Sequence, residues 1–279
     1  IKNAAYFFAH KLGYQVSEIP VDSSGLVDID VYQSMLNDQV LFVSMMAVNN
    51  EIGVIQPIQK LAELAHNVGA IFHCDAAQAP EAIDIDVKQW NVDMLSLSAH
   101  KVYGPKGIGA LYIKNSLQAS LPPFIHGGGQ QFGQRSGTLP TGLSVGFAKA
   151  MELSREGAEH NRTWLSSMKQ RFLAGLRNND IDFTINGTTD NTHPGCLNIR
   201  FANVDATNLL AGMQPEICAS TGSACNSEYP QASHVLSAIG LTEAEATSSL
   251  RFSFGRYNDA AQIDRAIEII HQQLTQAYS

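Results

Sequence analysis

The 279-residue chain has no apolar run long enough to cross a bilayer, and residues 1–20 lack the charged start, apolar middle and cleavage site of a secretory signal. We therefore expect neither a membrane protein nor a secreted one, and predict a cytoplasmic location. Positive charge is also scarce, because 18 basic residues stand against 26 acidic ones and give a net charge of −8. Such a field repels a phosphate backbone, so no nucleic-acid partner is expected.

Cysteine is rare as well, and its spacing matches neither a zinc motif nor the framework of a small disulfide-rich domain. No metal site is predicted. Cys74, Cys196 and Cys218 have apolar or strand-like neighbours, so we expect them to be small buried apolar residues. Cys225 differs, because the segment STGSACNSEYPQAS around it is small and polar, as in an exposed mobile loop.

The chain contains no internal repeat and no low-complexity tract; instead, apolar runs of strand length alternate with helix-period segments. The pattern predicts helices at 3–12 and 57–68, and strands at 14–19, 40–46, 70–75, 93–98 and 109–113. Continuously apolar strands separated by helices indicate a mostly parallel sheet flanked by helices on both faces. This α/β part is predicted to form a large domain, residues 1–158.

The second half of the chain predicts a smaller domain of the α+β class, residues 159–279. A long connecting helix runs to about residue 177. It is followed by short strands near 196–201, 217–219 and 250–254, and by helices near 205–212, 231–239 and 259–276.

The stretch LSLSAHKVYGPKGIGALYI, residues 95–113, delivers Ser98, His100 and Lys101 from an apolar strand into a loop rich in glycine. Ligands of parallel sheets collect outside the carboxyl ends of the strands. An isolated lysine is usually a solvated surface residue. In a partly dehydrated pocket, however, it loses its proton easily and forms a Schiff base with an aldehyde cofactor. Lys101 is therefore a candidate cofactor lysine.

Pyridoxal 5′-phosphate (PLP) needs phosphate donors, an anion at its pyridine nitrogen and a group beside its phenolic oxygen. Ser98 and His100 can supply the donors, Asp75 the anion, and Gln78 and Asn50 the ring contacts. Each has an ordinary alternative: Asp75 as a helix cap, His100 as a loop histidine, and Gln78 and Asn50 as turn or surface residues. Their joint position at successive strand ends favours the cofactor.

Six segments in order over essentially the whole chain carry a resemblance: VNNEIGVIQPI, HCDAAQ, SLSAHKVYGPKGIGALY, HGGGQQFGQRSGT, STGSAC and SSLRFSFGR. Together they resemble the cysteine desulfurases, PLP enzymes of fold type I and aminotransferase class V. The resemblance implies the PLP-dependent transferase type I fold, with Lys101 as the Schiff-base lysine. It gives Asp75, Gln78, Asn50, Ser98 and His100 the cofactor contacts already suggested.

The resemblance also implies roles that the residues alone do not. Thr138 matches a threonine that reaches the phosphate of the neighbouring subunit, which implies a homodimer with shared active sites. Arg251, together with Asn50, matches the group that holds the substrate carboxylate, and a guanidinium suits this because it grips a carboxylate bidentately. Cys225 matches the cysteine that takes sulfur from L-cysteine as a persulfide and leaves L-alanine.

The form STGSAC resembles the desulfurases that serve iron–sulfur cluster assembly, so a sulfur acceptor or scaffold protein is an expected partner. Selenocysteine lyases share most of these motifs and stay an alternative. In the family, a phosphate loop and a cofactor-stacking histidine precede the position of Ile1, and no methionine occurs before Met35. We therefore expect an N-terminally truncated large domain with an exposed apolar face. A non-catalytic paralogue acting as an interaction module is the alternative from another class.

The family's C-terminal tail, which helps to dock the scaffold, is short here, since the chain stops at QQLTQAYS. Two other chemistries are weaker. A hydrolase triad of Cys225, His100 and Asp75 leaves Lys101 and Arg251 without a role. The glycines at 127–129 do not open a helix after a strand, as a dinucleotide site requires.

Overall fold

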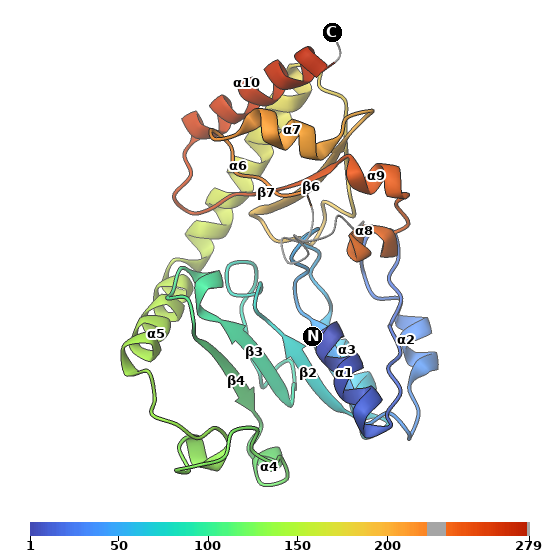
Figure 1. Ribbon diagram of the computed structural model, residues 1–279, viewed down its shortest axis with the longest axis vertical. Helices are drawn as coiled ribbons and strands as arrows, with labels where there is room; N and C mark the ends of the chain where they lie inside the picture. The colour runs from blue at the N-terminus through green and yellow to red at the C-terminus, as the bar shows by residue number, and fades with distance from the viewer. Residues whose placement is uncertain (222–232, 278–279) are drawn as a thin grey trace.

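The structure is a computed structural model that describes residues 1–221 and 233–277. It contains two sheets, in the lower and upper halves of Figure 1. The first has the order β1-β2-β3-β4, with β1 at Phe42–Met46, β2 at Ile71–Asp75, β3 at Met94–Ser98 and β4 at Gly109–Ile113. The second has the order β5-β6-β7, with β5 at Phe183–Ile185, β6 at Cys196–Phe201 and β7 at Ser249–Ser253.

The first sheet is mostly parallel, as the sequence predicts. Strands β1, β2 and β3 run parallel, whereas β4 returns antiparallel to β3. The connection between β3 and β4 is short, since it consists of the 3₁₀ turn η1, Ala99–Val102, and a few further residues. A parallel return would need a longer crossover, usually a helix, so β4 pairs antiparallel to β3.

One face of this sheet packs on α3, Ile58–His66, and we call it the covered face. Its core includes Val43, Phe72 and Leu95 from three successive strands, packed with Leu61 and Ala65 of α3. Pro57 sits at the start of the helix, where a missing N–H costs nothing. The predicted helix at 57–68 is thus confirmed, and its apolar stripe accounts for the covered face.

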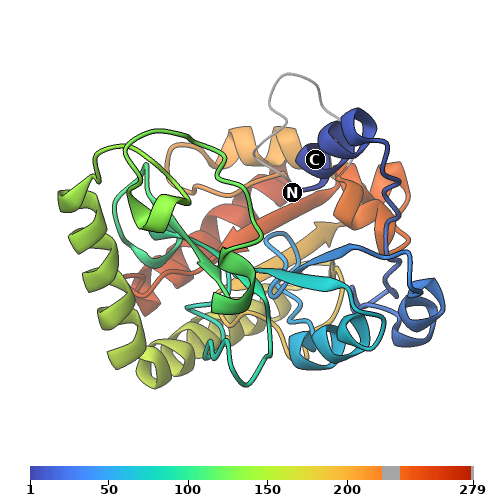
Figure 2. The same cartoon turned by 90° about the horizontal axis from the view of Figure 1, so that it is seen from below.

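The opposite face, which we call the open face, carries Phe42 and Leu111, whose side chains are 48% and 52% exposed. Helix α1, Lys2–Leu12, lies on this side in both Figures 1 and 2, but none of its residues is buried. Helices therefore flank the sheet, as the sequence predicts, but no described element packs closely against the open face. The expected exposed apolar face is found.

The second half of the chain has its own core. Helices α5, Thr141–Glu156, and α6, Ala158–Asn178, are separated at Gly157, and α6 packs against α10, Ala260–Ala277. Phe172, Phe252 and Ile270 join this core with α7, Ala206–Met213. The break at Gly157 agrees with the predicted domain boundary near residue 158, which stays a prediction.

Short elements complete the fold, and most of them were not predicted: α2 at Ile29–Met35, α4 at Asn115–Gln118, η2 at Gln131–Gly133, α8 at His234–Ala238 and α9 at Glu243–Thr247. The predicted strands at 14–19 and 217–219 are wrong. Near them, only isolated bridges join Val21 to Val27 and Ser220 to Arg251. Within residues 1–221 and 233–277, no helix is long and apolar enough to traverse a bilayer.

Candidate active site

The turn that carries Lys101 is fixed by its buried neighbours. Ala99 and Val102 have no exposed surface, and between them His100 and Lys101 are exposed. The Gly104 N–H donates to the Ala99 carbonyl at 2.9 Å, and a Cβ at Gly104 would lie only 2.8 Å from that oxygen. The turn therefore requires glycine at this position, which explains the glycine that closely follows Lys101.

The setting of Lys101 differs from the expected one. Its side chain lines a cavity but is exposed, so the prediction of a partly dehydrated lysine is wrong for the described chain. Lys101 is exposed because η1 extends beyond the end of β3, next to the open face of the sheet, where no described element packs closely.

Three predicted cofactor contacts lie at the carboxyl edge of the sheet. The Ser98 hydroxyl and the Nδ1 of His100 are hydrogen bonded at 3.1 Å. Asp75 pairs with Ser96 in the parallel register, so Asp75, Ser96 and Ser98 share the open face. The Asp75 Oδ1 accepts a hydrogen bond from the Ala77 N–H at 3.0 Å. Asp75 and His100 thus have different partners, which gives no support to a Cys–His–Asp triad.

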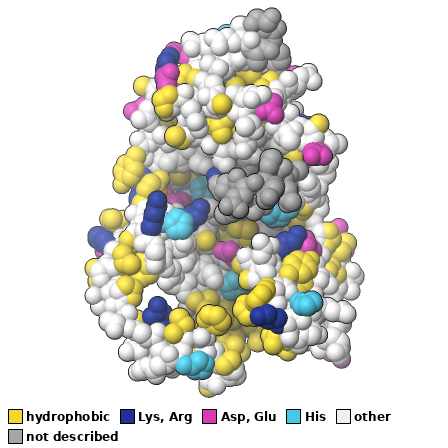
Figure 3. Space-filling model, in the orientation of Figure 1, with side chains coloured by type: hydrophobic (Ala, Val, Ile, Leu, Met, Phe, Trp, Pro, Cys, Tyr) yellow, Lys and Arg dark blue, Asp and Glu magenta, His cyan; other side chains and the backbone are white. Residues whose placement is uncertain are grey.

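A cavity of about 210 Å³ collects five of the predicted residues, from segments far apart in the sequence: Asn50, Gln78, His100, Lys101 and Arg251. The Arg251 Nη1 donates to the Asn50 carbonyl at 3.0 Å. Its buried Nε has no partner in the part of the chain that the structure describes. Figure 3 shows basic and histidine side chains gathered in the hollow between the two halves. The cavity can therefore receive an anionic group at Arg251.

Three predicted residues that the structure describes do not line this cavity, namely Asp75, Ser98 and Thr138. Asp75 and Ser98 lie at the carboxyl edge of the sheet. Thr138 is exposed between η2 and α5 and is not part of the lining. Cys225 lies outside the described residues.

The other three cysteines were predicted to be buried; Cys74 is buried, Cys196 is half-buried and Cys218 is exposed. Burial raises the pKa of the Cys74 thiol to about 12 and that of Cys196 to about 11, so both are protonated near neutral pH. Cys218 is exposed, and its predicted burial is wrong, because residues 217–219 form a loop rather than a core strand. Among the described residues, no group of three or more His, Cys, Asp or Glu side chains is placed to hold a metal ion.

The lining residues that were not predicted from the sequence include Glu81, Tyr103 and His193. None of these three lies directly at the end of an apolar strand. A search for polar residues at the carboxyl ends of strands therefore does not identify them. Glu81 follows Gln78 by three residues, and this spacing is the one signal that pointed near it. His193 belongs to the second half of the chain and reaches the cavity only through the packing of the two halves.

Because His193 is buried, we expect the folded protein to lose stability in acid. Burial, helped by the nearby Lys169 and Arg162 charges, lowers the His193 pKa from 6.5 to about 4, and Nδ1 accepts a hydrogen bond from the Gly195 N–H at 2.9 Å. The His193 pKa is lower in the folded protein than in the unfolded chain. Neutral His193 therefore stabilises the fold fully above the unfolded pKa of 6.5, and this stabilisation is lost as the pH falls towards 4. We expect the wild-type protein to lose about 2 kcal/mol more than His193→Gln between about pH 7 and about pH 4.5. Urea denaturation at both pH values measures this difference, and equal losses contradict it.

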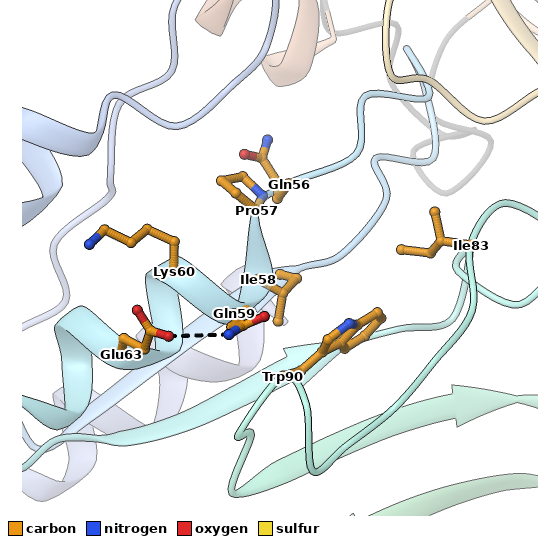
Figure 4. A pocket seen from close by; sticks show the side chains of 8 residues that line it. All are labelled: Gln56, Pro57, Ile58, Gln59, Lys60, Glu63, Ile83 and Trp90. Carbon is orange, nitrogen blue, oxygen red and sulfur yellow. Dashed lines mark hydrogen bonds between the residues drawn. The ribbon is translucent and has the colours of Figure 1, made fainter.

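A second, more open groove of about 400 Å³ lies at the N-terminal end of α3 (Figure 4). It is bordered by Trp90, Ile83 and residues 56–60, and Gln59 Nε2 donates to Glu63 Oε1 at 3.3 Å. None of the predicted site residues lines it, so the smaller cavity is the candidate active site.

Comparison with known proteins identifies the class of this site. Residues 1–266 match the model of the aminotransferase class V family. The mitochondrial cysteine desulfurase of Arabidopsis thaliana is 42% identical over 262 residues, which cover 94% of this chain and 58% of the plant protein. A solved NifS-like protein superposes with a TM-score of 0.89 at 29% identity, covering 98% of this chain and 72% of that one.

A further solved structure, SspA in complex with cysteine, superposes with a TM-score of 0.76 at 36% identity, covering 92% of this chain and 71% of that one. The chain spans 52% to 63% of the length of the curated relatives it matches.

Proposed function

The chain belongs to the aminotransferase class V family, and on this premise we propose that it is a PLP-dependent cysteine desulfurase. In this reaction L-cysteine gives L-alanine, and its sulfur is transferred to the Cys225 thiol as a persulfide. The observation that carries the proposal is the convergence of Lys101, Gln78 and Arg251 on one cavity. The relatives are named as cysteine desulfurases, and one neighbour was solved with cysteine.

The residues at the cavity fit PLP. Lys101 offers an exposed primary amine that would hold the aldehyde group of the cofactor, and the Ser98–His100 pair would offer donors for its phosphate. Asp75 lies on the same face of the sheet as Ser98 and offers an anion for the pyridine nitrogen, while Gln78 and Asn50 offer amides for the ring. PLP, when bound, supplies the electron sink for cleavage of the carbon–sulfur bond.

The chain's own residues then have distinct tasks. Arg251 and Asn50 bind the substrate carboxylate and so orient the amino acid; the Lys101 amine accepts and returns protons at the substrate Cα and Cβ carbons. Cys225, as a thiolate, attacks the substrate sulfur. Two electrons pass from the carbon–sulfur bond to Cβ, which is protonated, so that alanine leaves and the sulfur stays on the Cys225 sulfur.

Arg251→Gln tests the carboxylate site. The variant loses the charge and the bidentate fork of the guanidinium, and a hydrogen bond to a charged group is worth about 1.5–3 kcal/mol. We expect the KM for L-cysteine to rise about 10- to 100-fold, with PLP binding unchanged. Arg265→Gln, on the surface of α10, is the matched control, since its partners are Glu216 and Glu268. A KM equal to that of the control contradicts the assignment.

A homodimer with shared sites is part of the proposal. It is supported by the exposed segment that contains Phe124, Phe132 and Thr138, in which the two phenylalanines are 86% and 94% exposed. A second copy would bury these rings and bring Thr138 to the partner's phosphate site. A sulfur acceptor, such as an iron–sulfur scaffold, and a cytoplasmic location are proposed in the same way. The plant relative, by contrast, is named as mitochondrial.

The experiment that tests the function is incubation of the PLP-loaded protein with L-cysteine. Alanine is quantified by chromatography, and the protein is examined by mass spectrometry for one added sulfur. We expect alanine and persulfide to form in equal amounts in a single turnover. Alanine without persulfide on Cys225, or neither product, contradicts the proposal.

A further inference from the structure

Glu81 is a buried carboxyl group that the proposed reaction does not use. Its side chain is only 9% exposed, and Oε1 accepts a hydrogen bond from the Ser154 hydroxyl of α5 at 2.7 Å. Oε2 is buried and has no hydrogen-bond partner in the described part of the chain. A buried carboxyl oxygen without a donor is costly, so its retention calls for a ligand or a function.

The surroundings of Glu81 indicate what such a ligand would be. Glu81 lines the same cavity of about 210 Å³ as Lys101 and Arg251. Among the lining residues that the structure describes, it is the only acidic one. Among its described lining residues, the cavity thus has basic groups for a carboxylate and for the cofactor, and a single acidic group with one buried oxygen that has no hydrogen-bond partner.

The proposed function fixes two ends of a bound amino acid. Arg251 takes its carboxylate, and its amino group faces the Lys101 side of the cavity. Because Glu81 lines the same small cavity, the side chain of an amino acid held at these two ends can lie beside it. A carboxylate at short range in a partly dehydrated cavity repels an anionic side chain and accepts a hydrogen bond from a neutral one.

We propose that Glu81 is a specificity-determining residue that admits amino acids with small neutral or hydrogen-bond-donating side chains and rejects those with anionic side chains. The proposal rests on the proposed function, because it needs Arg251 to hold the α-carboxylate. It goes beyond that function by naming the residue that sets the charge of the side chain the site accepts.

The test compares two probes of similar backbone, L-alanine and L-aspartate, by titration of the PLP-loaded protein. Dissociation constants are read from the change in visible absorbance, so turnover is not needed. We expect L-aspartate to bind at least tenfold more weakly than L-alanine. In Glu81→Gln, which keeps the shape and removes the charge, we expect this ratio to fall at least fivefold, mainly through tighter L-aspartate binding.

Two matched variants separate charge from structure. Glu81→Asp keeps the carboxylate and should keep the preference for L-alanine. Ser154→Ala removes only the donor to Oε1 and should also keep it, because Ser154 does not line the cavity. A structural role for Glu81 would change both dissociation constants alike. An unchanged ratio in Glu81→Gln overturns this inference alone, whereas no response to L-alanine in the wild-type protein overturns the proposed function and this inference together.

Discussion

Lys101→Ala abolishes the visible absorbance of the PLP-loaded protein and lowers the rate of alanine formation by about 10²–10⁴-fold or more. The reason is that Lys101 is the residue proposed both to anchor the cofactor and to move protons at the substrate, and the variant lacks its amine. The measurement is an absorbance spectrum after removal of free PLP, followed by an alanine assay with L-cysteine.

Lys106→Ala is the matched control, because Lys106 is an exposed lysine of the same loop, five residues further on. It should retain both the spectrum and the activity. If Lys106→Ala loses the spectrum and the activity as Lys101→Ala does, the loss is caused by misfolding of the loop and not by removal of a cofactor-binding amine. If Lys101→Ala keeps the visible band, another lysine binds the cofactor and the site is wrongly assigned.

Cys225→Ser separates cofactor binding from sulfur transfer. The hydroxyl is a far weaker nucleophile than a thiolate near neutral pH, so the variant cannot receive sulfur. We expect protein-bound persulfide to fall below detection and alanine formation to drop by about 10²-fold or more, while the visible absorbance of bound PLP is unchanged. Mass spectrometry of the intact protein after a single turnover measures the persulfide.

Cys218→Ser provides the control for this experiment, since Cys218 is an exposed cysteine that precedes Cys225 by seven positions. It should carry the persulfide on Cys225 as the wild-type protein does. Persulfide that persists in Cys225→Ser and disappears in Cys218→Ser would move the sulfur-accepting role to Cys218.

Much of the first half of the fold follows from local patterns. The apolar runs around Phe72 and Leu95 predict buried parallel strands, and Pro57 marks the start of α3. The direction of β4 was not predictable from its composition, because it depends on the few residues that reverse the chain after Lys101.

The candidate site is predictable where it follows the ends of strands. Lys101, His100 and Asn50 lie a few residues beyond such ends, and all three line the cavity. Glu81 and His193 reach it only through the packing of α5, α6 and the loop before β6, which leaves no periodic signal in the sequence. The exposure of Lys101 was missed for a similar reason, because it depends on what packs against the open face of the sheet rather than on local residues.

Binding of PLP in this cavity is tested by the absorbance spectrum of the purified protein with PLP, recorded before and after L-cysteine is added. We expect a visible band that is absent in Lys101→Ala and that shifts when L-cysteine binds. A spectrum identical to that of free PLP, unaltered by L-cysteine beyond what free PLP itself shows, would contradict the claim that this cavity holds the cofactor.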